Sequence, residues 1–91
     1  MNFNEYELGF QPAGAVVEVT LSGTAANVVL LDWPNLSAFR AGRNYRYHGG
    51  HTTVSPVHLT VPADGQWYVV VNLGGYIGKV HTSCRVLAPT S

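Results

Sequence analysis

The stretch VVEVTLSGTAANVVLLDWPN, residues 16–35, decides the fold of this chain. In its first half Val17, Val19 and Leu21 alternate with polar residues, which is the period of a strand with one buried face. A Ser-Gly pair with the chemistry of a turn follows, and residues 28–31 are then apolar at every position. Such an uninterrupted apolar run is typical of a strand covered on both faces. The stretch therefore predicts two strands, the second of them central in its sheet.

The same alternation with a period of two continues further along the chain. It recurs over residues 44–48, 57–61, 66–73 and 79–87, and turns rich in Gly, Pro and Asp separate these segments. Because proline cannot donate to a strand ladder, Pro56 predicts that the strand after it lies at a sheet edge or begins with a bulge. We predict an all-β fold, a compact antiparallel β-sandwich of about seven strands with one short helical turn.

The single helical pattern is NLSAFRAG, residues 35–42. Asn35 is suited to cap the first turn, and Leu36 and Phe39 are spaced to share one face. Gly42 suits the position just after a helix, where a left-handed conformation is common. We expect one or two helical turns held against the sandwich by Phe39.

Length and charge limit the classes of protein to which this chain can belong. At 91 residues we expect one domain over 1–91, with a core of about 3–87 and a tail at 88–91. The five basic residues cancel the five acidic ones, so no overall field favours nucleic acid. The single cysteine excludes an internal disulfide, and no apolar run is long enough for a signal peptide or a membrane span. We therefore expect a cytoplasmic protein.

The motif HGGH, residues 48–51, raises the question of a metal site, because imidazole is a common ligand. Histidines three or four apart share a face on a helix, but the flanking residues here have a strand pattern. We predict no metal, and we interpret Gly49-Gly50 as a turn or bulge between two strands, with His48 and His51 beside it.

Catalytic constellations are not indicated. Cys84 is expected to face the core, and its nearest histidine, His81, is expected on the opposite face of the same strand. Asp32 and Asp64 both stand at strand ends, where aspartate is common as a turn former. We therefore predict neither an enzyme nor a cofactor.

The strongest candidate for binding is an arginine cluster. In a chain with only 11% charged residues, three arginines fall within seven positions, and an aromatic residue and a histidine follow them. Guanidinium groups suit carboxylates and phosphates, and a neighbouring ring can stack on a flat ligand. We predict a non-enzymatic binding or interaction module for a small anionic ligand or a protein partner, with a site formed by Asn35, Arg40, Arg43, Arg46, Tyr47 and His48.

Two alternatives remain open. Trp33 and Tyr68 offer a surface on which a sugar could stack, which predicts a carbohydrate-binding sandwich if Trp33 is exposed; Trp67, in phase with Val69, is expected in the core. Sheet edges with few charges, such as the strand after Pro56, could instead pair with a second copy. That alternative predicts a self-associating structural subunit, for instance a homodimer.

Several segments together resemble one family. The chain is similar to the small bacterial proteins grouped as DUF1883, a domain of unknown function, from about residue 3 to Leu87. The resemblance is carried by VVEVTLSGTAANVVLLD (16–32), NLSAFRAG and YRYHGG (within 35–50), SPVHLTVP (55–62) and GQWYVVVNLGGYIGKV (65–80). The matched positions are Asn27, Asp32, Asn35, Phe39, Arg40, Gly42, Tyr47, Gly49, Gly50, Trp67, Gly74, Gly75 and Tyr76.

The resemblance implies a compact all-β sandwich, found alone or attached to TIR signalling domains. It brings no catalytic residues that could be carried over to this chain. An association with signalling domains is what an interaction or ligand-sensing module in bacterial signalling would show, so the resemblance favours binding over catalysis.

Overall fold

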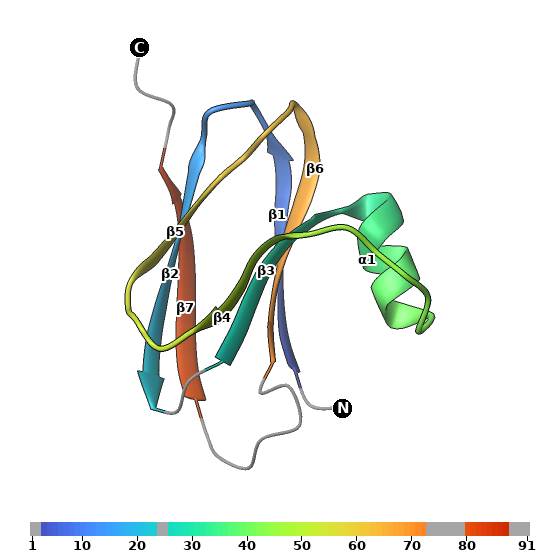
Figure 1. Ribbon diagram of the computed structural model, residues 1–91. Helices are drawn as coiled ribbons and strands as arrows, with labels where there is room; N and C mark the ends of the chain where they lie inside the picture. The colour runs from blue at the N-terminus through green and yellow to red at the C-terminus, as the bar shows by residue number, and fades with distance from the viewer. Residues whose placement is uncertain (1–2, 24–25, 73–79, 88–91) are drawn as a thin grey trace.

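The computed structural model describes residues 3–23, 26–72 and 80–87. Within them two antiparallel sheets face each other, and one helix lies outside the sandwich (Figure 1). The predicted all-β sandwich with one short helix is therefore confirmed. The elements are β1 (Phe3–Gln11), β2 (Val16–Gly23), β3 (Ala26–Asp32), α1 (Trp33–Arg40), β4 (His48–Thr52), β5 (Val57–Thr60), β6 (Gly65–Asn72) and β7 (Val80–Leu87).

The strands divide into a four-stranded sheet, in the order β1-β6-β3-β4, and a three-stranded sheet, in the order β5-β2-β7. Every pair of neighbours is antiparallel. β3 lies between β6 and β4, so the prediction of a central strand is confirmed. β5 lies at the edge of its sheet, as Pro56 predicts, because a residue without an N–H fits beside an unpaired edge.

The main core fills the space between the two sheets. Its largest members are fully buried valines and leucines from β2, β3 and β6, such as Val17, Leu30 and Val69. Cys84 and Val86 of β7 pack against this cluster, as the alternation of that strand predicts. Burying this apolar surface away from water is the main force that holds the two sheets together.

A second apolar cluster lies on the outer face of the four-stranded sheet, beneath α1. Leu36 of the helix is fully buried there against Val29, Leu31 and Val70, and the partly buried rings of Phe39, Tyr45 and Tyr68 close the cluster. β3 is thus covered on both faces, which is why residues 28–31 are all apolar. Figure 1 shows the helix on the side of this sheet that faces away from the three-stranded sheet.

The helix begins two residues earlier than predicted, and its cap is Asp32 rather than Asn35. The Asp32 carboxylate accepts a hydrogen bond from the backbone N–H of Asn35 at 3.1 Å. Pro34 lies in the first turn of the helix, where proline fits because the backbone N–H groups there have no partner within the helix. The other end is as predicted: Ala41 is the C-cap, and Gly42 follows with a φ of 71°.

The prediction that Gly49-Gly50 is a turn or bulge between two strands is wrong. The pair is part of β4. Gly49 pairs with Val29, and Gly50 pairs with Val28. Both glycines have positive φ angles, and a Cβ atom on Gly49 would overlap the carbonyl oxygen of Val28. The pair therefore lets an edge strand approach β3 closely. The predicted strand at 44–48 is also wrong, because residues 43–47 form an irregular connection from α1 to β4.

β1 was not assigned from the sequence, although its pattern contains the signal. Tyr6 and Leu8 pack against the core, whereas Glu5 and Glu7 alternate with them on the other face. The pairing with β6 shifts by one residue between Glu7 and Gly9, and this bulge interrupts the alternation just where it would otherwise become long enough to recognise.

Candidate binding groove

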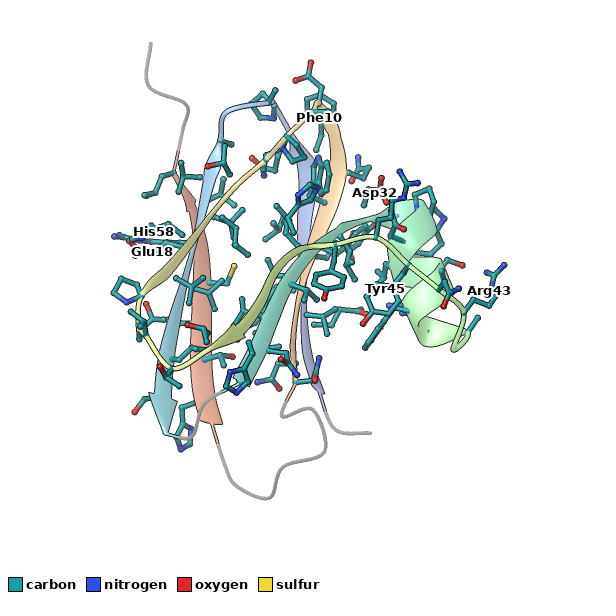
Figure 2. The ribbon with its side chains drawn as sticks, in the orientation of Figure 1. Phe10, Glu18, Asp32, Arg43, Tyr45 and His58 are labelled. Atoms are coloured by element: carbon teal, nitrogen blue, oxygen red, sulfur yellow. The ribbon has the colours of Figure 1, made fainter. Side chains whose placement is uncertain are left out.

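An open groove lies where β3 leads into α1 and the connection 43–47 returns toward β4. Its volume is about 560 Å³. Figure 2 shows Asp32 at the start of the helix and Tyr45 on the returning connection. The groove is lined by Leu30, Asp32, Asn35, Tyr45, Arg46, Tyr47, His48 and Trp67.

Asn35 holds the two walls of the groove together. Its side-chain N–H donates to the Asp32 carboxylate at 2.7 Å, and its side-chain oxygen accepts from the backbone N–H of Arg46 at 2.7 Å. The first turn of α1 is thereby tied to a connection that has no strand ladder of its own. Because both ends of the amide are bonded within the protein, Asn35 acts by positioning Arg46.

Aromatic rings stiffen the returning connection. Tyr45 meets Phe39 of α1 edge-on, with ring centroids 5.3 Å apart, and Tyr47 lies 5.5 Å from Tyr45. Tyr45 is partly buried in the cluster beneath the helix, whereas 49% of Tyr47 is exposed. The connection therefore presents Tyr47 as an exposed ring on an anchored backbone, a common arrangement at binding sites.

The floor of the groove is apolar and rigid. Leu30 is fully buried, and only 6% of Trp67 is exposed. The Trp67 indole N–H donates to the carbonyl of Ala63 at 2.9 Å, which fixes the orientation of the ring. His48, the first residue of β4, lies with its ring 6.1 Å from that of Trp67 in an edge arrangement. The predicted core position of Trp67 is confirmed.

Arg46 provides the positive charge of the groove. Its side chain is exposed, and none of the ion pairs among the described residues involves it. The nearby Asp32 carboxylate already accepts two hydrogen bonds from Asn35. The groove thus combines an available guanidinium fork with the rings of Tyr45, Tyr47 and Trp67. Such a fork binds carboxylates and phosphates with two parallel hydrogen bonds.

The arginine cluster divides between different sides of the helix. Arg40 makes two hydrogen bonds to Glu5 of β1, one of them from Nε to Oε1 at 3.1 Å. Arg43 is exposed beyond the end of α1 and points into solvent, away from Asp32 (Figure 2). The groove therefore brings together four of the six predicted residues, Asn35, Arg46, Tyr47 and His48, and leaves Arg40 and Arg43 outside.

The comparisons with known proteins place the chain in one family. The model of the family described as "Domain of unknown function (DUF1883)" matches residues 1–90. The chain belongs to the DUF1883 family. Comparison with curated proteins and with solved structures found no match. Of the positions that carry the resemblance, Gly74, Gly75 and Tyr76 of this DUF1883 domain lie outside the described residues.

Four residues of the DUF1883 groove were not among the predicted site residues: Leu30, Asp32, Tyr45 and Trp67. Two of them, Leu30 and Trp67, were expected only as core residues. A core position in the sequence does not indicate that one edge of the side chain also reaches a groove. Asp32 and Asn35 carried the available signal, because two polar residues three positions apart at the end of a buried strand can bond to each other.

The other histidines and the cysteine of the DUF1883 domain lie outside the groove. His51 pairs with Asn27 and follows His48 by three positions in β4, so these two imidazoles face opposite sides of the sheet. Burial raises the pKa of the Cys84 thiol. Among the described residues, no group of three or more His, Cys, Asp or Glu side chains gathers as a metal site would require, and none of the helices is long and apolar enough to cross a membrane.

Proposed function

We propose that this protein is a non-enzymatic binding module that holds a small anionic molecule with a flat ring in the groove. The observation that carries the proposal is Arg46, an exposed residue whose guanidinium group has no ion-pair partner among the described residues, in a groove that Tyr47 and Trp67 also line. A groove of about 560 Å³ has the size of known small-molecule sites. The proposal includes the cytoplasmic location that the composition predicts.

Charge within the groove sets the orientation of the ligand. Asp32 lies at the start of α1, and Arg46 lies on the opposite wall, to which Asn35 ties it. A carboxylate or phosphate group is repelled by Asp32 and attracted by Arg46, so the anionic end binds at the connection 43–47. The flat part of the ligand then lies along the exposed ring of Tyr47 and meets Trp67 at the edge that reaches the groove, and the His48 ring can donate a further hydrogen bond.

Calorimetric titration with phenyl phosphate tests this proposal, because the probe carries one ring and one anionic group. We expect Arg46→Ala to weaken binding by about tenfold to a hundredfold, the usual effect of removing a charged hydrogen-bond partner. Arg43→Ala is the matched control, since it removes the same charge three residues away and outside the groove. Equal losses in both variants would contradict the proposal, because they would indicate attraction by surface charge alone.

A second test examines the ring of Tyr47. It compares phenyl phosphate with inorganic phosphate, which carries the anionic group of the probe without its ring. Tyr47→Leu keeps an apolar side chain but removes the ring, and we expect it to weaken phenyl phosphate by about threefold to tenfold. Its effect on inorganic phosphate should stay within about twofold. If Tyr47→Leu weakens the binding of phenyl phosphate and of inorganic phosphate alike, Tyr47 shapes the connection and does not stack on the ligand.

A further inference from the structure

A second aromatic surface lies on the outer face of the four-stranded sheet, between α1 and β1. Trp33, the first residue of the helix, is 52% exposed, although tryptophan is highly buried on average. Its ring lies 6.0 Å from that of Tyr68 in β6, with the two planes inclined by 51°. Tyr68 follows Trp67 directly, so their side chains face opposite sides of the sheet. This surface is thus separate from the groove.

The polar groups beside these rings come from the helix and from β1. The guanidinium carbon of Arg40 lies 5.9 Å from the centre of the Trp33 ring, and the same group makes two hydrogen bonds to Glu5. Glu7 is directly opposite Tyr68 in the pairing of β1 with β6, so it lies on the same face. We call the five residues Glu5, Glu7, Trp33, Arg40 and Tyr68 the aromatic ledge.

The charge of the ledge differs from that of the groove. The positive charge of Arg40 is balanced by Glu5, and Glu7 is an additional exposed carboxylate, so an anionic ligand is disfavoured. The guanidinium group retains N–H groups beyond the two that bond Glu5, and the carboxylates retain free lone pairs. Hydrogen-bond donors and acceptors therefore stand together beside an exposed indole ring.

We propose that the aromatic ledge binds a neutral sugar. A pyranose ring has an apolar face of C–H groups that can lie on the indole of Trp33, and its hydroxyl groups both donate and accept hydrogen bonds. Donation to Glu7 and acceptance from Arg40 satisfy hydroxyls of both kinds without any charge on the ligand. The site goes beyond the anion-binding function proposed for the groove and does not depend on it.

Support of the helix does not account for the ledge by itself. Tyr68 does pack beneath α1, together with Phe39, and that packing explains its partial burial. It leaves more than half of Trp33 in water, where a smaller or polar residue would serve the first turn of a helix equally well. Tryptophan, tyrosine and arginine together are also typical of protein interfaces, and the test below distinguishes a protein partner from a sugar.

The two tryptophans make the test selective, because the chain has two indole N–H groups, one at each site. The ¹⁵N-labelled full chain is titrated with cellotriose and with maltotriose, which offer pyranose rings in β and α linkage. We expect at least one of them to shift the indole signal of Trp33 and leave that of Trp67 in place, with a dissociation constant of about 1 mM, as a shallow site allows.

Variants separate a sugar site from a non-specific effect. Trp33→Ala should abolish the sugar-dependent shifts of backbone signals around the ledge, with the remaining spectrum unchanged as evidence of folding. Phe10→Ala is the matched control, since it removes another exposed ring, 61% exposed, from the opposite end of β1. We expect its response to the sugar to stay within about twofold of the original.

The outcomes that overturn the proposal are distinct. If neither sugar moves the Trp33 signal, or if the backbone shifts persist in Trp33→Ala, the ledge is not a sugar site. A larger shift of the Trp33 indole signal with choline than with either sugar would show that the acidic groups of the ledge select cations. A shift of that signal only on addition of a second protein would show a protein interface. None of these outcomes changes the expected response of Trp67 to phenyl phosphate, so failure here is separate from failure of the groove.

Discussion

The two sheets present very different outer faces to their surroundings. The outer face of the four-stranded sheet is covered by α1 and carries an apolar cluster around Leu36, with the aromatic ledge between the helix and β1. The groove opens where β3 leads into α1, over Leu30 and Trp67 of the core-facing side of the same sheet. Among the described residues, no helix covers the outer face of the three-stranded sheet. Its centre is Glu18, whose carboxylate accepts hydrogen bonds from His58 of β5 and Arg85 of β7 at 3.0 and 2.7 Å. Figure 2 shows Glu18 and His58 on the side of the molecule opposite α1.

This difference indicates how the sandwich divides its tasks. The helix shields one sheet and so creates concave edges, where anchored rings and charged groups meet at fixed positions. The open face relies on ion pairs across strands, and such exposed pairs contribute little to stability because water and salt screen them. We therefore expect substitutions around β3, β4 and α1 to be costly, and substitutions around Glu18 to have small effects that depend on pH.

Gly49→Ala should have the largest effect. Its Cβ atom would overlap the carbonyl oxygen of Val28 in the neighbouring strand, and its φ of 113° disfavours any side chain. We expect the free energy of unfolding to fall by about 3–5 kcal/mol, measured by denaturant titration. Gly50→Ala is the matched control: its φ of 150° is also unfavourable, but no atom lies within 4 Å of the added Cβ atom. A loss of about 1–2 kcal/mol is expected there, and equal losses would contradict a close approach at Gly49.

Leu36→Ala tests the attachment of the helix to the four-stranded sheet. Leu36 is fully buried among Val29, Leu31 and Val70, so its truncation leaves a cavity and should lower the free energy of unfolding by about 2–4 kcal/mol. His58→Ala on the open face should cost less than about 0.5 kcal/mol. If the two variants lose similar stability, the contrast between the two faces is wrong.

Asn35→Ala should connect stability with binding. It removes the hydrogen bonds to Asp32 and to the backbone of Arg46, and it should lower the free energy of unfolding by about 1–2 kcal/mol. Because Arg46 is then no longer held beside the helix, we also expect phenyl phosphate to bind several-fold more weakly. Ser37→Ala, elsewhere on the same helix, should leave that affinity unchanged. Unaltered affinity in Asn35→Ala would show that the connection 43–47 is held by its rings alone.

The smallest effect is expected at Glu18, where the difference between variant and original protein should be present at neutral pH and disappear in acid. Arg85, and then His58, lower the pKa of Glu18 from its ordinary value of 4.5. A carboxyl group whose pKa is lower in the folded state stabilises that state above its unfolded pKa and loses this contribution as the pH falls through the folded value. Glu18→Gln should therefore lose less thermal stability than the original protein between neutral pH and a pH of about 3. Parallel loss in both proteins would contradict a role for these pairs.

Much of the fold could be predicted because it follows from burial and from which residues can donate to a strand ladder. The apolar run at 28–31 indicates the central strand, Pro56 indicates an edge, and Trp67 in phase with Val69 indicates the core. The glycine pair was misassigned because positive φ angles serve both turns and close approaches between strands. The helix start was misassigned because Asp32 and Asn35 are both good caps, and only the structure decides between them.

The candidate site was less predictable, because it depends on where the chain turns after α1. Arg40 and Arg46 are only six residues apart, yet the helix directs one toward β1, and the connection after Gly42 places the other beside Asp32. Arginine clustering in the sequence could not separate these two directions. The carbohydrate-binding alternative depended on exposure of Trp33, and this residue is 52% exposed.

The central claim is that the groove binds an anionic ring while the aromatic ledge does not. The most direct test is the indole region of a ¹⁵N spectrum during titration with phenyl phosphate, since Trp67 reports on the groove and Trp33 on the aromatic ledge. We predict that the Trp67 signal moves and saturates, that the Trp33 signal stays in place, and that Arg46→Ala removes the response. A Trp67 signal that does not move, or equal shifts of the Trp67 and Trp33 signals, would contradict the account.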